Sequence, residues 1–192
     1  AAGTSNVGVL KEGTFRFITL YRYLYGSEFY LGSETLEKHY GQELDVHLLG
    51  FNLAYGINKK FTIDLELSAF PDKNLNFGYS QDRISGFNSA SLIGKYTIFS
   101  HKASSQELTL GAGPKLKLTN NRILSGNNGV IAQLFYFINI YDDINIVLFN
   151  RSEFYIEDKD QFKSGNNIST SLFLTKELFE KFNAILESRY EI

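Results

Sequence analysis

The sequence predicts an all-β protein that folds as one antiparallel up-and-down β-barrel of about 8–12 strands. Three observations support this fold class. Apolar and polar residues alternate with a period of two over most of the chain, as in strands with two different faces. The connections between these runs are long and short in turn, which is typical of a meander of hairpins. The runs reach about 10–13 residues, whereas strands in soluble proteins usually have about five or six.

Nine strands are predicted. The pattern is clearest in the third, where Phe61 and Leu65 fall on one face and Thr62 and Asp64 fall on the other. In chain order, the predicted strands cover 13–26, 44–57, 61–70, 87–99, 106–118, 129–141, 144–156, 166–176 and 181–192.

Other strands repeat this division into two faces. In the first, Phe15 and the following aromatic residues lie opposite Arg16. In the fifth, Leu110 lies opposite Lys115, and Gly113-Pro114 predicts a bulge because proline cannot donate to the ladder. An odd count of nine is unusual for a bacterial barrel, so either residues 3–10 supply an extra edge or a closing strand lies outside the given chain. We favour the second alternative, for a total of about ten or twelve strands.

The connections differ in length at the two ends of the predicted sheet. The long ones are polar and rich in turn-forming residues, and the short ones resemble tight hairpin turns. The long connections are 27–43, 71–86, 119–128 and 157–165, and the short ones are 58–60, 100–105, 142–143 and 177–180.

The composition excludes several functions. The chain has 192 residues, which fits a single domain over 1–192. Its 19 basic and 21 acidic residues leave a formal net charge of −2, so there is no basic field for nucleic acid. It has no cysteine, which excludes disulfides, thiolate metal ligands and a cysteine nucleophile.

The distribution of charge favours a membrane barrel over a soluble barrel or sandwich. Charges of both signs stand at mid-strand on the polar face, whereas the apolar face carries almost none. Aromatic residues such as Tyr23, Tyr55 and Tyr96 collect near strand ends, as in interfacial girdles. We therefore expect a mature chain in a bacterial outer membrane after removal of a signal peptide, in contact with outer-membrane lipid, with 1–12 as an N-terminal periplasmic segment.

Segments 13–32, 43–70 and 85–118 carry glycine and aromatic motifs, including Tyr21-Arg22-Tyr23, Gly94-Lys95-Tyr96 and Leu110-Gly111 followed by Pro114. With these motifs the chain resembles the transporter-type outer-membrane barrels of the phenol meta-degradation pathway. The chain departs from that family at Phe87-Asn88, where the family often has Gly-Asp. The resemblance implies an outer-membrane barrel with a transport role.

The charged side chains on the polar face are the candidate lumen-lining residues, and two interpretations of them stay open. In a narrow barrel they pair across the interior and close it, whereas in a wider one they line an aqueous path and set its selectivity. The candidates are Arg16, Arg22, Asp64, Glu66, Lys95, Glu107, Lys115, Lys117, Arg151 and Glu153.

The function expected from these features is passive passage of small solutes, hydrophobic ones included. The first alternative is a structural or interaction barrel with protein partners in a cell-envelope assembly, and a weaker one is an outer-membrane lipid hydrolase. Asp45 and His47 share a strand face, and His101 is followed closely by Ser104 and Ser105. Neither group makes a convincing catalytic set, so we expect no enzyme activity, no catalytic residue, no metal site and no cofactor.

Overall fold

The computed structural model describes residues 8–27, 30–31, 34–35, 42–76, 80–101, 105–119, 127–141, 144–157, 165–179 and 182–191. These residues form nine long strands and one small hairpin. The long strands are β1 (Phe15–Gly26), β4 (Glu43–Asn58), β5 (Phe61–Asn76), β6 (Gln81–His101), β7 (Gln106–Lys117), β8 (Gly129–Tyr141), β9 (Ile144–Tyr155), β10 (Asn167–Phe179) and β11 (Phe182–Glu191). The hairpin pairs β2 (Tyr30–Leu31) with β3 (Glu34–Thr35).

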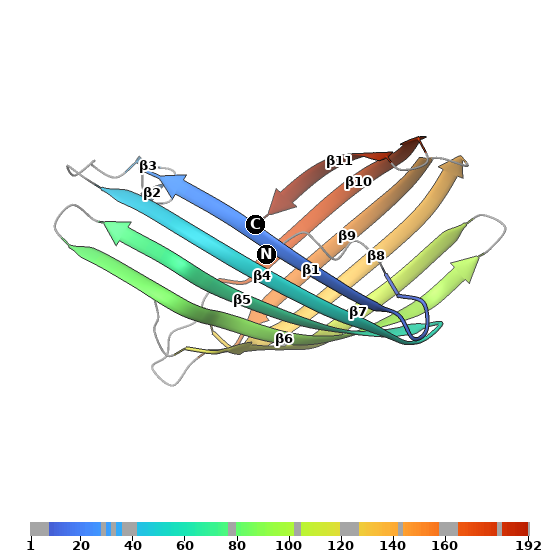
Figure 1. Ribbon diagram of the computed structural model, residues 1–192, viewed down its shortest axis with the longest axis horizontal. Helices are drawn as coiled ribbons and strands as arrows, with labels where there is room; N and C mark the ends of the chain where they lie inside the picture. The colour runs from blue at the N-terminus through green and yellow to red at the C-terminus, as the bar shows by residue number, and fades with distance from the viewer. Residues whose placement is uncertain are drawn as a thin grey trace.

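The nine long strands make one antiparallel sheet in which each strand pairs with its neighbours in the chain. The order is β1-β4-β5-β6-β7-β8-β9-β10-β11. Figure 1 shows this sheet curled into a half-barrel, with β1 and β11 at its two edges. The predictions of an all-β chain, of nine strands and of up-and-down order are therefore confirmed.

The two edges of the sheet have no strand partner among the described residues. β1 is the first and β11 the ninth of nine strands that alternate in direction, so they run the same way. Antiparallel pairing between them is therefore not available, and the edges cannot join by the pattern that holds the rest of the sheet together.

One predicted connection was wrong. Most of the segment expected to form the loop 71–86 belongs to β5 and β6, and only 77–80 separates these strands. The proline that suggested a strand end, Pro71, lies where the β5–β6 register shifts between Phe70 and Lys73. At such an irregularity a missing backbone donor is tolerated, so the strand continues past the proline.

The bulge predicted at Gly113-Pro114 was also wrong. The β7–β8 register passes through both residues without a shift, and the β6–β7 pairs on either side of them keep one register. A Cβ atom on Gly113 would lie 1.8 Å from the backbone oxygen of Leu92. Glycine is needed here because two strands approach closely.

In a soluble protein the buried face of a sheet is apolar and the exposed face is polar, and this sheet has the reverse arrangement. On the concave face, Asp64 and Lys95 are both 0% exposed. On the convex face, Phe15 is 71% and Leu65 is 38% exposed. The predicted division of each strand into an apolar and a polar face is confirmed, and it is the apolar face that points outward.

Apolar packing inside the hollow is limited. Its main cluster consists of Phe135 on β8, Val147 and Phe149 on β9, and Phe173 on β10. The rings of Phe135 and Phe149 stack with their centroids 4.5 Å apart. The rest of the interior is filled largely by polar and charged side chains, which gives the concave face its functional interest.

Candidate functional site

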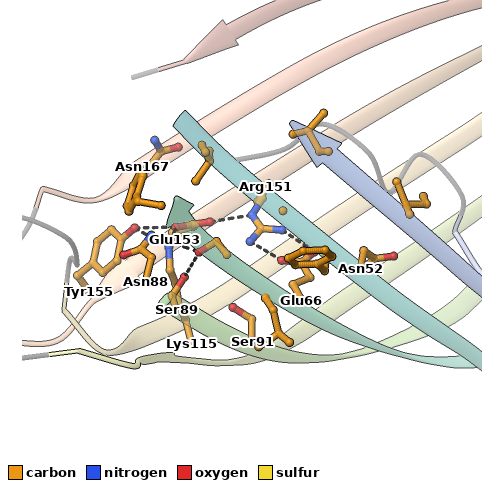
Figure 2. A pocket seen from close by; sticks show the side chains of 18 residues that line it. Asn52, Glu66, Asn88, Ser89, Ser91, Lys115, Arg151, Glu153, Tyr155 and Asn167 are labelled. Carbon is orange, nitrogen blue, oxygen red and sulfur yellow. Dashed lines mark hydrogen bonds and ion pairs between the residues drawn. The ribbon is translucent and has the colours of Figure 1, made fainter. Parts of the chain in front are cut away.

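An ion pair crosses the hollow between strands that are not neighbours in the sheet. Arg151 on β9 donates from Nη1 to Glu66 Oε1 at 3.0 Å and from Nη2 to Glu66 Oε2 at 2.8 Å, and Glu66 lies on β5. β6, β7 and β8 separate these two strands in the sheet. The sheet is therefore curled tightly enough for opposite walls to touch through their side chains, as Figure 2 shows.

A second group of charges continues this bridge along the β7–β9 wall. Glu153 accepts from Arg151 Nε at 2.8 Å and from Lys115 Nζ at 2.5 Å. Tyr155 donates its hydroxyl to Glu153 at 2.6 Å and accepts from Lys115 at 2.9 Å. Lys115, Arg151, Glu66 and Glu153 thus form one network in which two positive and two negative charges balance.

A third group lies on the other wall. Lys95 Nζ lies 2.6 Å from Asp64 Oδ2, and Arg16 Nη2 lies 3.6 Å from the same oxygen. Lys95 also lies over the ring of Phe135, with Nζ 4.8 Å from the ring centroid. Both members of the closer pair are fully buried, so each charge depends on the other for compensation.

Residues 8–13, which include the end of the predicted periplasmic segment 1–12, cover the concave face of the sheet. They do so at the end of the sheet that carries the short turns. Leu10 N donates to Thr62 Oγ1 at 2.8 Å, and Gly13 N donates to the backbone oxygen of Gly56 at 2.8 Å. A Cβ atom on Gly56 would lie 2.1 Å from the backbone oxygen of Lys11, so glycine is required where the segment crosses β4. Residues 1–7 lie outside the described residues.

The remaining predicted lumen residues also lie on the concave face. Glu107 accepts from Thr109 at 3.1 Å and from Thr97 at 3.4 Å. Arg22 alternates with the outward aromatic residues of β1, and Lys117 alternates with the outward residues of β7 such as Leu116; both are partly buried. The structure therefore places all ten candidates on one face, and it joins seven of them in the three groups described above.

A cavity of about 260 Å³ lies beside the Arg151–Glu66 bridge. β1, β4 and β5 contribute apolar side chains together with Asn52, Glu66 and Ser68, and β6, β7 and β9 contribute mainly polar side chains. Figure 2 shows the labelled polar residues, with Asn88 and Asn52 on either side of the Arg151–Glu66 bridge. The cavity lining includes Ile18, Leu20, Leu48, Asn52, Glu66, Phe70, Asn88, Ser89, Lys115, Arg151, Glu153 and Tyr155.

Sequence reasoning missed several of these residues. Tyr155 and Asn52 were not proposed as lumen residues, although each falls on the predicted polar face of its strand. Asn88 falls on the predicted apolar face of its strand and lines the cavity at the register shift between β5 and β6, so alternation could not have found it. Gln133 was missed as well; it is 3% exposed, and neither polar atom of its amide has a hydrogen-bond partner among the described residues. The period-two alternation was the signal that could have found the other three, had uncharged polar residues been included.

A polar cluster on the convex face marks the end of the apolar surface nearest the long loops. Tyr21 Oη lies 2.6 Å from His47 Nδ1, and His47 Nε2 lies 3.3 Å from Asp45 Oδ1. On the neighbouring strands β5 and β6, Arg83 donates two hydrogen bonds of 3.0 and 2.7 Å to the Asp72 carboxylate. These hydrogen bonds from Arg83 lower the pKa of the Asp72 carboxyl.

In the part of the chain that the structure describes, the Asp45–His47 pair gains no nucleophile, and the group around His101 is described only in part. The Asp45–His47 pair contacts a tyrosine, and no serine hydroxyl is bonded to it among the described residues. The ring of His101 stacks on Phe99 at 6.3 Å, and Ser104 lies outside the described residues. The absence of enzyme activity stays a prediction.

No family model, curated protein or solved structure matches the chain. The family resemblance inferred from the glycine and aromatic motifs therefore stays a prediction. Within the described ranges, no three histidine, aspartate or glutamate side chains come together in a way that could hold a metal ion. The part of the chain that the structure describes contains no helix long and apolar enough to cross a membrane.

Proposed function

We propose that the protein is a bacterial outer-membrane β-barrel that lets small solutes cross passively. The observation that carries this proposal is the reversed polarity of the sheet, with charged pairs buried on its concave face and large apolar side chains exposed on its convex face. In water this arrangement exposes apolar surface at a cost of about 25 cal/mol per Å². In a bilayer the same surface is stabilising.

The length of the apolar surface also fits a bilayer. On β5, alternate residues from Phe61 to Ala69 point outward, and the polar cluster with Asp72 follows. Nine residues cover about 30 Å of strand at about 3.3 Å each, which projects to about 21 Å when the strand is tilted by about 45°. An apolar band about 25 Å tall is characteristic of outer-membrane barrels.

Closure of the barrel in a membrane through antiparallel pairs alone needs a further strand. Unpaired backbone groups are costly in hydrocarbon, so the free edges of β1 and β11 must be covered there. Because these edges run the same way, a strand antiparallel to both would satisfy them. This supports the expectation of an additional closing strand.

The interior favours a narrow and selective path over a wide pore. The Arg151–Glu66 bridge spans the hollow, and residues 8–13 cover its short-turn end. Small barrels fill their interiors with side chains in this way. Passage would follow the hydrated surface of the charged groups, and the bridge would form the constriction.

The same bridge supports the second candidate function, a structural or interaction barrel in an envelope assembly. If the cross-wall pairs never open, the interior is closed and the convex face and loops carry the function. The hydrolase alternative is weaker because, among the described residues, His47 is bonded to a tyrosine hydroxyl and to no serine.

Fractionation and reconstitution test the proposal. The native protein should sediment with outer membranes and migrate faster on a gel before boiling than after it. In liposomes it should give discrete conductance and admit small solutes. Outer-membrane protein without conductance that co-purifies with envelope proteins would favour the assembly role, and a detergent-independent soluble monomer would refute the barrel.

A further inference from the structure

We infer that β4, β5 and β6 continue past the bilayer on the long-loop side as a small water-exposed sheet, and that the outward face of this extension contacts the polar headgroups of the lipid. The extension comprises 43–47 of β4, 72–76 of β5 and 81–86 of β6. It begins where the apolar band of the convex face ends, which on β5 is at Ala69. This inference rests on the proposed function, since it names where the membrane barrel leaves the hydrocarbon and what it meets there.

The polarity of β4 inverts along its length, although its side chains keep their alternation. Nearer the short turns, Asn52 is buried on the concave face and Leu53 is exposed on the convex face. In the extension, Val46 is buried on the concave face, and the polar His47 and Asp45 point outward. The β1–β4 register continues through this stretch without a shift. An apolar inner face with a polar outer face is the arrangement of a sheet in water.

The outward faces of β5 and β6 change at the same level. In the apolar band, Leu67 of β5 pairs with Ala90 of β6, whereas in the extension Asn74 pairs with Arg83. Gln81 Nε2 donates to Asn74 Oδ1 at 3.0 Å across the two strands. Polar groups therefore replace apolar side chains on this face, and headgroups and water can hydrogen-bond with them.

The inner face of the extension is mixed on these two strands. Leu75 and Ile84 point inward together with the charged Lys73 and Asp82. Lys73 Nζ lies 5.1 Å from the centroid of the Phe70 ring. Charged groups therefore stand on both faces of the extension, which fits water on its two sides and does not fit hydrocarbon on either.

Backbone irregularities mark the line between the apolar band and the extension. The β4–β5 register shifts between His47 and Leu49, and the β5–β6 register shifts between Phe70 and Lys73. On β6, Gly86 has a φ of 142°, a conformation that residues with side chains rarely adopt. Irregularities of this kind bend and twist a strand. The strands are thus able to change direction at the level where their polarity changes.

The extension is long enough to pass through the headgroup layer. The last described β6–β7 pair joins Ser89 to Lys117, and β6 continues beyond it to Gln81. At the left of Figure 1, β4, β5 and β6 reach farther than β9. Residues 70–76 of β5 cover about 23 Å at about 3.3 Å each, or about 16 Å along the membrane normal at a tilt of about 45°. The headgroup layer on each side is only about 5–8 Å thick, so the extension begins among headgroups and ends in water.

Single-cysteine variants test where the strands leave the hydrocarbon, because the chain has no cysteine of its own. Asn74→Cys and Gln81→Cys lie on the outward face of the extension, and Leu67→Cys and Leu116→Cys lie on that of the apolar band. In lipid nanodiscs, both sides of the bilayer are open to reagent. A charged maleimide should label the first two positions at least about tenfold faster than the last two, because hydrocarbon excludes the charge.

A second measurement tests contact with headgroups. A bimane fluorophore on His47→Cys, at the start of the extension, should be quenched more strongly by a lipid with a nitroxide on its headgroup than by one with a nitroxide in its acyl chain. Bimane on Leu67→Cys should show the reverse order. Faster migration on a gel before boiling than after it shows that each variant is folded. Asn74 and Gln81 lie on different strands, so one labelling test remains if the other variant fails to fold.

Slow labelling of Asn74→Cys or Gln81→Cys, at the rate of Leu67→Cys, would overturn the extension while leaving the protein in the membrane. Stronger quenching of the His47→Cys bimane by the acyl-chain nitroxide, or none by the headgroup nitroxide, would overturn the contact with headgroups. Rapid labelling of both Leu67→Cys and Leu116→Cys would instead refute the membrane barrel itself.

Discussion

Replacement of Glu66 by glutamine tests whether the charged pairs hold the two walls together. Glu66→Gln keeps the shape of the side chain and removes the carboxylate that receives two hydrogen bonds from Arg151. Arg151 and Lys115 are then left with a single carboxylate, Glu153, between them. Because the Arg151 side chain is 8% exposed, water can compensate its charge only in part.

The expected cost follows from the known range for such pairs. Removing one partner of a buried ion pair destabilises a protein by about 3–5 kcal/mol. Glu66 itself is 20% exposed and Arg151 keeps Glu153, so we expect a smaller loss, about 2–3 kcal/mol. Urea unfolding in lipid vesicles measures this loss, with tyrosine fluorescence as the signal because the chain has 12 tyrosines and no tryptophan.

The convex face offers a matched control. Asp72→Asn removes a carboxylate that also receives two hydrogen bonds from one arginine, but there Arg83 is 73% exposed. This change should cost about 0–1 kcal/mol. Adding Arg151→Met to Glu66→Gln should recover part of the loss, because the uncompensated charge is removed. Equal losses for Glu66→Gln and Asp72→Asn, or no recovery in the double variant, would refute a buried cross-wall bridge.

Three further predictions address the faces, the N-terminal segment and the open edges. Leu65→Arg should destabilise the barrel in vesicles by about 2–4 kcal/mol, because it places a charge near the bilayer midplane; a neutral effect would mean that this face does not meet lipid. Gly56→Ala should displace the crossing segment and raise single-channel conductance, whereas Gly26→Ala, where an added Cβ meets nothing within 4 Å, should not; unchanged conductance in Gly56→Ala would show that the segment does not obstruct the path. Cysteine pairs placed along β1 and β11, beginning with Thr19→Cys and Ser188→Cys, should form no disulfide, because an intervening strand holds the edges about 10 Å apart. Rapid disulfide formation in membranes would indicate direct closure.

The number of strands and the side to which each residue points could be predicted from the sequence. Both depend on the backbone, in which successive side chains point to opposite faces whatever the rest of the chain does. Asp64 and Leu65 are neighbours in the chain, yet one is fully buried and the other faces outward, as their alternation predicted. The ten charged candidates were placed on one face for the same reason.

Strand ends were less predictable where a local irregularity replaced a turn. Pro71 resembled the end of a strand, but a register shift accommodates it and β5 continues to Asn76. Gly113 resembled a bulge, but it permits close contact with Leu92. In both cases the same residue types suit two local geometries, and the neighbouring strand decides between them.

The sequence by itself determined the all-β meander and its two faces, because period-two alternation is a local property of an extended chain. Only the tertiary structure decided which charges meet. Arg151 and Glu66 are 85 residues apart and lie on strands with three others between them. Their contact depends on the curvature and stagger of the whole sheet, and so do the cavity beside them and the position of residues 8–13 against the concave face. These features are set by the sum of many strand pairings, so no short segment of the sequence carries a signal for them.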